Sequence, residues 1–334
     1  MQSPTLEQPS RTKPLFHSKR VRLSFSFGEF SLFRVPFQMW VWTPHFTRAS
    51  DAGKPHPADN LQPWISDEMT EGGRLKLDGL FFGSYPTEQE LPKLAFQTGY
   101  LRFVRSAYRR FVVDLHGSFE DYEKKFSSKT RSTLRKKVRK FAEISGGTND
   151  WKVYRTVAEI EEFFSLALPL SARTYQDKLL DAGLPASAEF RSHARELAEA
   201  DQARAYLLFH EGKPVAYVFC PIVDRALIYE YVGYDPEYRE SSPGTVLQYL
   251  LLESLFQEQK FDIFDFTEGE GPHKELFATG SIRCADIFYF KPTLRNRLLV
   301  TSQAGLSSLS RSTVNVLRKA GIDKRIKQMI RGRA

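Results

Sequence analysis

The chain has 334 residues, a hydrophobic fraction of 41% and a net charge of +8. This length exceeds one average domain and the apolar content suffices for a buried core, which excludes a chain disordered throughout. Two cysteines are too few for a disulfide framework or a zinc site, and the seven histidines form no closely spaced pair, so no metal is expected. No apolar run is long enough to span a membrane, and the sequence is typical of a cytoplasmic protein.

The positive charge is concentrated at the C-terminal end of the chain. Residues 292–334 contain ten Lys or Arg and one acidic residue, a net +9, so the rest of the chain is close to −1. A near-neutral chain before the tail lacks the positive charge that binding to a phosphate backbone requires. Nucleic acid is therefore not expected as a partner.

The N-terminal part alternates between a leader, strand-like segments and loops. Residues 1–20 are expected to be a flexible leader, and 43–73 a long loop. Strands are predicted for 21–42, interrupted at Gly28 and Pro36, for 75–85 and for 111–115. Helices are predicted for 86–96 and for 118–145, the second ending at Gly146-Gly147.

The remaining chain mixes helices and strands in an order typical of an α/β sheet with hairpins and a crossover helix. Helices are predicted for 156–180, 188–200, 243–259 and around Lys274; strands for 203–210, 214–222, 226–234, 261–266 and 285–290. Glu211-Gly212-Lys213 predicts a tight hairpin. Neither a GxGxxG motif after the first strand nor a P-loop is present, so Rossmann and P-loop folds are not indicated.

A basic helix is the first of three segments that carry chemistry. Seven of the twelve residues from Lys129 to Lys140 are basic, and apolar residues at helical spacing indicate that one face packs against the protein. Arg131 and Arg135 lie on a separate stripe that could attract phosphates or an anionic acceptor. A solvated charged face is the alternative interpretation.

The second segment is the start of the helix predicted after Tyr234. Ser242 can cap this helix, Pro243 suits its first turn, and Gly244 lets a ligand approach the backbone closely. Unpaired N–H groups and the helix dipole at such a start favour an anion. An ordinary capped core helix is the alternative.

The third segment is the polar loop after the strand 261–266. Glu268, Glu270 and His273 are candidate proton acceptors for an attacking ammonium group, and Lys274 follows them directly. Ligands commonly bind at strand ends beside a crossover helix. A polar loop with turn glycines is the alternative interpretation.

In order and spacing, the three segments resemble the GNAT acetyltransferases of the cellulose and exopolysaccharide (CelD/BcsL) type, which are relatives of the Fem-type aminoacyltransferases. The resemblance covers about residues 110–292. It rests on SSKTRSTLRKKVRK from Ser127, on the stretch from Gly233 to Gly244, and on the strand and loop from Phe264 to Lys274. Two departures are His273 in place of the usual tyrosine and the lack of an R/Q-x-x-G-x-G/A loop.

The resemblance implies an α/β fold in a double, Fem-like GNAT arrangement. The implied parts are a leader (1–20), a degenerate lobe containing the basic helix 127–141 (21–145), a catalytic GNAT domain (146–292) and a basic amphipathic tail (293–334). It also implies direct attack of an amine on acetyl-CoA or another acyl-CoA, without a metal. The acceptor would be an amine-bearing small molecule or glycan precursor of cell-envelope or exopolysaccharide biosynthesis.

The resemblance also assigns roles to residues. Ser242, Gly244 and Thr245 would hold the donor diphosphate, Tyr229, Tyr231 and Gly233 would line the pantetheine channel, and Lys274 would contact the donor. Glu268, Glu270 or His273 would accept the proton. An aminoacyl-tRNA-dependent transferase and a non-catalytic scaffold of envelope assembly remain alternatives, which the near-neutral body and the retained acidic loop respectively disfavour.

The C-terminal tail alternates apolar and basic residues at helical spacing. Such a helix can lie on an anionic membrane surface, and it can equally pack its apolar stripe on the protein. Gly305 and Gly321 favour several short helices over one long helix.

Overall fold

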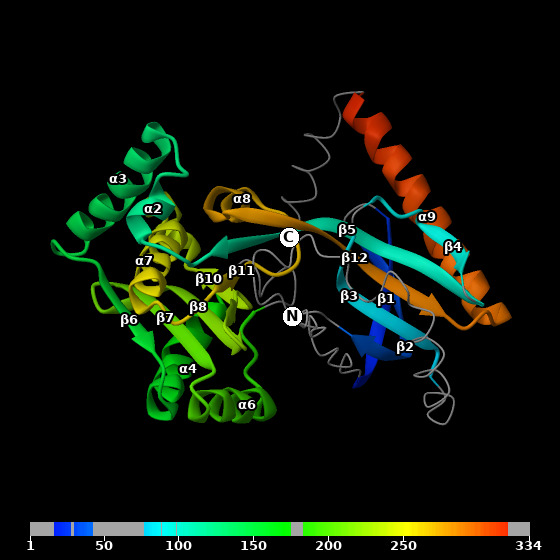
Figure 1. The fold of residues 1–334 in the computed structure, drawn as a ribbon, viewed down its shortest axis with the longest axis horizontal. Helices are drawn as coiled ribbons and strands as arrows, with labels where there is room; N and C mark the ends of the chain where they lie inside the picture. The colour runs from blue at the N-terminus through cyan, green and yellow to red at the C-terminus, as the bar shows by residue number, and fades with distance from the viewer. Residues whose placement is uncertain are drawn as a thin grey trace, which may run out of the picture. The chain divides into compact units, whose positions relative to one another are not determined.

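The structure is a computed structural model that describes residues 17–27, 30–42, 77–87, 89–97, 99–174 and 183–319. These residues form two compact units (Figure 1). The described residues between Tyr108 and Arg283 form the central unit, and the two flanking parts of the chain form the terminal unit. The divisions fall within two strands, after Ala107 and after Arg283.

The terminal unit is a sheet with a helix against its first strand. Its elements are β1 (His17–Phe27), β2 (Phe30–Trp42), β3 (Gly79–Pro86), β4 (Leu94–Gln97), the beginning of β5 (Tyr100–Asp114), the end of β12 (Gly280–Phe290) and α9 (Leu294–Lys319). The strand order is β1-β2-β3-β12-β5, with β4 beside β5. A core of aromatic and aliphatic side chains, including Phe37, Phe103 and Phe290, lies on the face that α9 covers.

Two predictions fail in this unit. The helix predicted for 86–96 is wrong, because Leu94–Gln97 pairs with β5 as a strand. The prediction of several short helices in the tail is also wrong as far as Lys319, since α9 continues through Gly305. Val300 is fully buried on the sheet, and this packing offsets the roughly 1 kcal/mol that a helical glycine costs. Gly321 lies outside the described residues.

In the central unit the strand order is β5-β11-β9-β8-β7-β6, with β10 beside β8. Its strands are the end of β5, β6 (Asp150–Tyr154), β7 (Ala203–His210), β8 (Lys213–Val223), β9 (Ala226–Ile228), β10 (Tyr231–Tyr234) and β11 (Ile263–Asp265). The β7–β8 hairpin turns at Glu211 and Gly212, both with positive φ, as predicted.

Helices cover both faces of this sheet (Figure 1). They are α2 (Phe119–Glu123), α3 (Ser128–Ile144), α4 (Val157–Ser171), α6 (Ala188–Glu199), the 3₁₀ helix η3 (Pro236–Ser241), α7 (Pro243–Glu258) and α8 (Pro272–Phe277). One core contains side chains of α2, α3 and α7, and a second contains those of α4 and α6. Side-chain caps from Ser127, Thr156 and Ser187 begin α3, α4 and α6.

Helix α7 is the buried centre of the first core. Val246, Leu247, Leu251 and Leu252 are at most 1% exposed. Burying one leucine side chain of this kind stabilises a fold by about 1.5–3 kcal/mol, so α7 is held firmly in place. Its first turn therefore has a fixed position relative to the strands that it covers.

Candidate active site

A break in one strand opens the central sheet. The sequence predicts a single strand over 226–234, but the structure has β9 and β10, separated at Tyr229 and Glu230. Strand β9 pairs with both β8 and β11, whereas among the described residues β10 pairs with β8. The Tyr229 N–H still donates to the Asp265 carbonyl at 2.9 Å, so the separation of β10 from β11 begins just after Tyr229.

A pocket lies at this opening, against the first two turns of α7. Its volume is about 250 Å³. The walls come from β8, the β9–β10 segment, α7 and α8, and the lining residues are Ala216, Tyr217, Val218, Tyr229, Val232, Gly233, Tyr234, Gly244, Thr245, Leu247, Gln248, His273 and Phe277. This lining includes neither aspartate nor glutamate.

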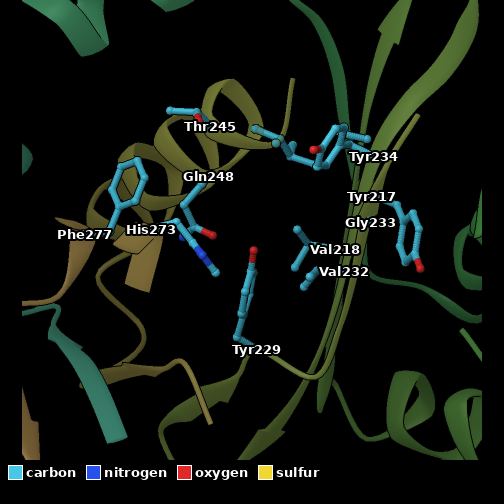
Figure 2. Close-up of a pocket in the computed structure, with 13 residues that line it drawn as sticks. Tyr217, Val218, Tyr229, Val232, Gly233, Tyr234, Thr245, Gln248, His273 and Phe277 are labelled. Atoms are coloured by element: carbon cyan, nitrogen blue, oxygen red, sulfur yellow. The ribbon is translucent and has the colours of Figure 1, made fainter. Parts of the chain in front are cut away.

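Figure 2 shows how the polar lining side chains lie. Gln248 of α7 and His273 of α8 extend into the pocket opposite Val218 and Val232, and the Tyr229 hydroxyl points toward them from the strand break. Burial raises the pKa of Tyr229, so its hydroxyl stays protonated near neutral pH and can donate a hydrogen bond. The pocket thus combines an apolar wall with a few polar groups, as small-molecule sites commonly do.

Gly244 keeps the pocket open at the start of α7. A Cβ atom added to Gly244 would lie 3.5 Å from the Tyr234 ring, an ordinary van der Waals distance, and the φ angle of this residue is not positive. Neither backbone strain nor close packing therefore requires a glycine here. The missing side chain leaves space in the pocket next to the N-terminal end of the helix dipole.

Ser242 precedes α7 but does not cap it in the predicted way. Its backbone is left-handed, with φ 57°, and its side chain makes no cap hydrogen bond. The Ser242 carbonyl accepts the N–H groups of Thr245 and Val246, and the side-chain oxygen accepts a hydrogen bond from Lys137 Nζ at 3.2 Å. The cap prediction is wrong because this left-handed backbone and the Lys137 contact leave the hydroxyl in a different hydrogen bond.

Lys137 brings the basic helix to the same helix start. It lies on α3, which packs against both α7 and η3. A flexible ammonium group beside the first turn of α7 adds a full charge to the partial charge of the helix dipole. Sequence analysis did not single out Lys137, because seven basic residues share this helix and only the packing shows which one reaches the pocket side.

The two arginines predicted to bind phosphate or acceptor lie away from the pocket, and Arg135 is engaged in an ion pair. Arg135 makes bidentate contacts with Glu123, a residue that is 3% exposed and whose carboxylate also accepts from the Tyr249 hydroxyl at 2.7 Å. Burial opposes ionisation of Glu123, but the hydrogen bonds from Arg135 and Tyr249 outweigh it and lower the pKa of this carboxyl group. Neither Arg131 nor Arg135 lines the pocket.

His273 is the member of the predicted proton-acceptor group that lines the pocket. Its ring centroid lies 6.4 Å from that of Phe266 and 6.5 Å from that of Tyr229. Burial of the ring, together with the neighbouring Lys274 cation, lowers the pKa of His273 below the ordinary histidine value. The imidazole is therefore neutral near pH 7 and able to accept a proton.

The other two candidate bases lie outside the pocket lining. Glu270 accepts the Arg109 N–H at 2.8 Å and lies 3.9 Å from the guanidinium group of the same arginine. Glu268 contributes its carbonyl oxygen, which accepts from Lys274 Nζ at 2.7 Å. Both glutamates thus lie in the loop between β11 and α8, just before His273.

Lys274 and a buried ion pair fix that loop. Lys274 Nζ also donates to the Phe266 carbonyl at 2.7 Å, and burial lowers its pKa to about 8 although Asp265 and Glu268 favour the charged form. Asp265 is fully buried, pairs with Arg110 at the end of β11, and accepts the Thr267 N–H at 2.8 Å. These contacts hold the Lys274 ammonium group against two backbone carbonyls, and Lys274 is not among the residues that line the pocket.

Gly233, Gly244, Thr245 and His273 of the predicted site therefore meet in one pocket. Tyr231 does not line it; its ring packs 5.1 Å from that of Phe190 in the core on the α4 and α6 side. Sequence reasoning missed Gln248. A single amide within the apolar run Val246–Leu252 was the available signal, since polar side chains are rarely placed in a buried helix without a partner.

The described residues contain neither a membrane-spanning helix nor a cluster of metal-binding side chains. No helix in the described part of the chain is both long and apolar enough to cross a membrane. Within the same residues, no group of three or more His, Cys, Asp or Glu side chains could hold a metal ion.

Residues 128–275 match the family described as "Acetyltransferase (GNAT) domain". The structure of FemX superposes with a TM-score of 0.52 at 9% identity, over 85% of this chain and 90% of FemX. The C-terminal domain of a putative lysylphosphatidylglycerol synthetase from Agrobacterium fabrum superposes with a TM-score of 0.50 at 11% identity. The superposition covers 87% of this chain and 88% of that domain. A sequence search found no match among curated proteins. Residues 128–275 are thus similar to a GNAT acetyltransferase domain, and the mixed α/β fold is similar to that of FemX.

Proposed function

We propose that the protein is an acyl-CoA-dependent N-acyltransferase whose active site is the pocket between β10 and α7. The supporting observation is the opening of the sheet after Tyr229 directly beside the start of α7. A long thioester can enter such an opening with its anionic end at the helix start and its acyl end at the strand break. The acetyltransferase domain match over residues 128–275 agrees with this class of reaction.

The donor diphosphate binds at the first turn of α7. Gly244 and Thr245 line the pocket there, and Lys137 reaches the same turn through Ser242. The helix dipole, the open space at Gly244 and the lysine cation all favour an anion at this place.

The acyl transfer itself needs a proton acceptor for the amine and a hydrogen-bond donor for the sulfur, which departs as a thiolate. The acceptor amine attacks the thioester carbonyl carbon; the new C–N bond forms and the C–S bond breaks. His273 takes the proton that the amine loses, and the Tyr229 hydroxyl donates a hydrogen bond to the departing sulfur. The resemblance noted in the sequence favours an amine-bearing glycan precursor of the cell envelope as acceptor.

The contribution of Lys137 gives a first prediction. Replacing Lys137 with Gln should weaken acetyl-CoA binding about ten-fold, because a charge-assisted hydrogen bond to phosphate is lost. Titration calorimetry at low and high salt measures this, and the difference between variant and parent should shrink as salt rises.

Lys136 supplies the matched control, since it lies on the same helix and is exposed. The Lys136→Gln variant should bind acetyl-CoA like the parent. Equal affinity in the two variants would mean that Lys137 does not contact the donor.

A further inference from the structure

Gln248 is a buried amide without a protein partner. Gln248 is 2% exposed. Among the described residues, neither its side-chain oxygen nor its side-chain nitrogen has a hydrogen-bond partner. Leaving such a group unpaired is costly, and most buried polar side chains in proteins are hydrogen-bonded. The amide lines the pocket and extends into it from α7 (Figure 2).

The fold does not need an amide at this position. The surrounding residues of α7, including Val246, Leu247, Leu251 and Leu252, are apolar and buried. An apolar side chain of similar shape would pack in this core without leaving a polar group unpaired. A ligand or water in the pocket is therefore the remaining source of hydrogen bonds for Gln248.

The position of Gln248 selects one part of the donor. It follows Gly244 by four residues, and one helical turn places it about 6 Å further along α7 from the proposed diphosphate site. In the pantetheine arm of coenzyme A, the first secondary amide follows the diphosphate after a short branched carbon chain. This amide thus falls beside Gln248, before the thioester reaches Tyr229 and His273.

The chemistry of the two groups is complementary. A secondary amide has one N–H donor and one carbonyl acceptor, and a glutamine side chain offers the matching acceptor and donor. We infer that Gln248 pairs with an amide of the pantetheine arm and thereby makes the pocket specific for pantetheine thioesters over other anionic ligands. This inference rests on the proposed function and assigns to the same pocket a specificity-determining residue.

Replacing Gln248 with Met tests the inference, because methionine has a similar length and no amide. Acetyl-CoA should bind about ten-fold or more weakly to Gln248→Met, since the donor amide then lacks its partner. Binding of adenosine 3′-phosphate 5′-diphosphate, which keeps the diphosphate but has no pantetheine arm, should be the same in variant and parent. Gln257→Met is the matched control, because Gln257 is exposed on the same helix.

Thermal unfolding separates binding from folding. Without ligand, Gln248→Met should unfold at the same or a higher temperature than the parent, whereas the stabilisation produced by acetyl-CoA should be reduced. If the parent binds acetyl-CoA and Gln248→Met binds it equally well, the inference is overturned while the proposed function stands. If the parent binds neither acetyl-CoA nor S-acetylpantetheine, the proposed function itself fails.

Discussion

Replacing His273 with Phe should lower turnover by about 10²–10⁴-fold, the usual contribution of a positioned general base. Phenylalanine can keep the ring contacts with Phe266 and Tyr229 but accepts no proton. Acetyl-CoA affinity should stay close to that of the parent protein, since the donor's anionic end is held at the start of α7. Steady-state rates and calorimetry on the same preparation measure both quantities.

The pH profile identifies the group that acts. The neutral imidazole is the base, so kcat/KM should rise with pH through the lowered pKa of His273 and level off above the ordinary value of about 6.5. This rise of kcat/KM should be absent in His273→Phe, while the change at higher pH that comes from titration of the acceptor amine should persist. Near-parental turnover in His273→Phe, with a large loss in Glu270→Gln, would move the base to the glutamate.

Replacing Gly244 with Val should abolish measurable acetyl-CoA binding, a loss of about 100-fold or more. A Cβ atom at Gly244 would be in ordinary van der Waals contact with the Tyr234 ring, 3.5 Å away, and Gly244 lines the pocket, so the two methyl groups of valine would enter the pocket. A side chain that occupies the place of the diphosphate excludes the donor instead of merely weakening a contact. Calorimetry with acetyl-CoA and with adenosine 3′-phosphate 5′-diphosphate, which keeps the diphosphate, should show the same loss.

The control for Gly244→Val is Gln257→Val on the exposed side of α7. Both variants should unfold at temperatures close to that of the parent, since neither residue is constrained by a positive φ or close packing. Parental affinity in a folded Gly244→Val protein would mean that the donor binds elsewhere.

Local patterns in the sequence predict most elements of the central unit. The Glu211-Gly212 turn acts over a few residues, so the hairpin that it forms can be predicted without a structure. The predicted helix over 86–96 failed because its apolar residues pair with β5 as a strand, and that contact is not encoded within the segment. Likewise, packing on the terminal sheet keeps α9 helical through Gly305.

The candidate site was predicted only in part for the same reason. The glycines and the helix start at Gly244 can be recognised from the local sequence. Which of His273, Glu268 and Glu270 lines the pocket depends instead on how the chain between β11 and α8 folds. The break at Tyr229 was not predicted because 226–234 alternates like one strand. Its division follows from β9 pairing with β11 while β10 follows β8.

Titration of the unmodified protein with acetyl-CoA, coenzyme A and aminoacyl-tRNA tests the central claim most directly. A pocket that binds a diphosphate at α7 and a pantetheine arm along β10 should bind one acetyl-CoA per chain and coenzyme A in competition with it. Binding of aminoacyl-tRNA should then be absent or insensitive to coenzyme A. No binding of acetyl-CoA, together with saturable binding of aminoacyl-tRNA, would contradict the account.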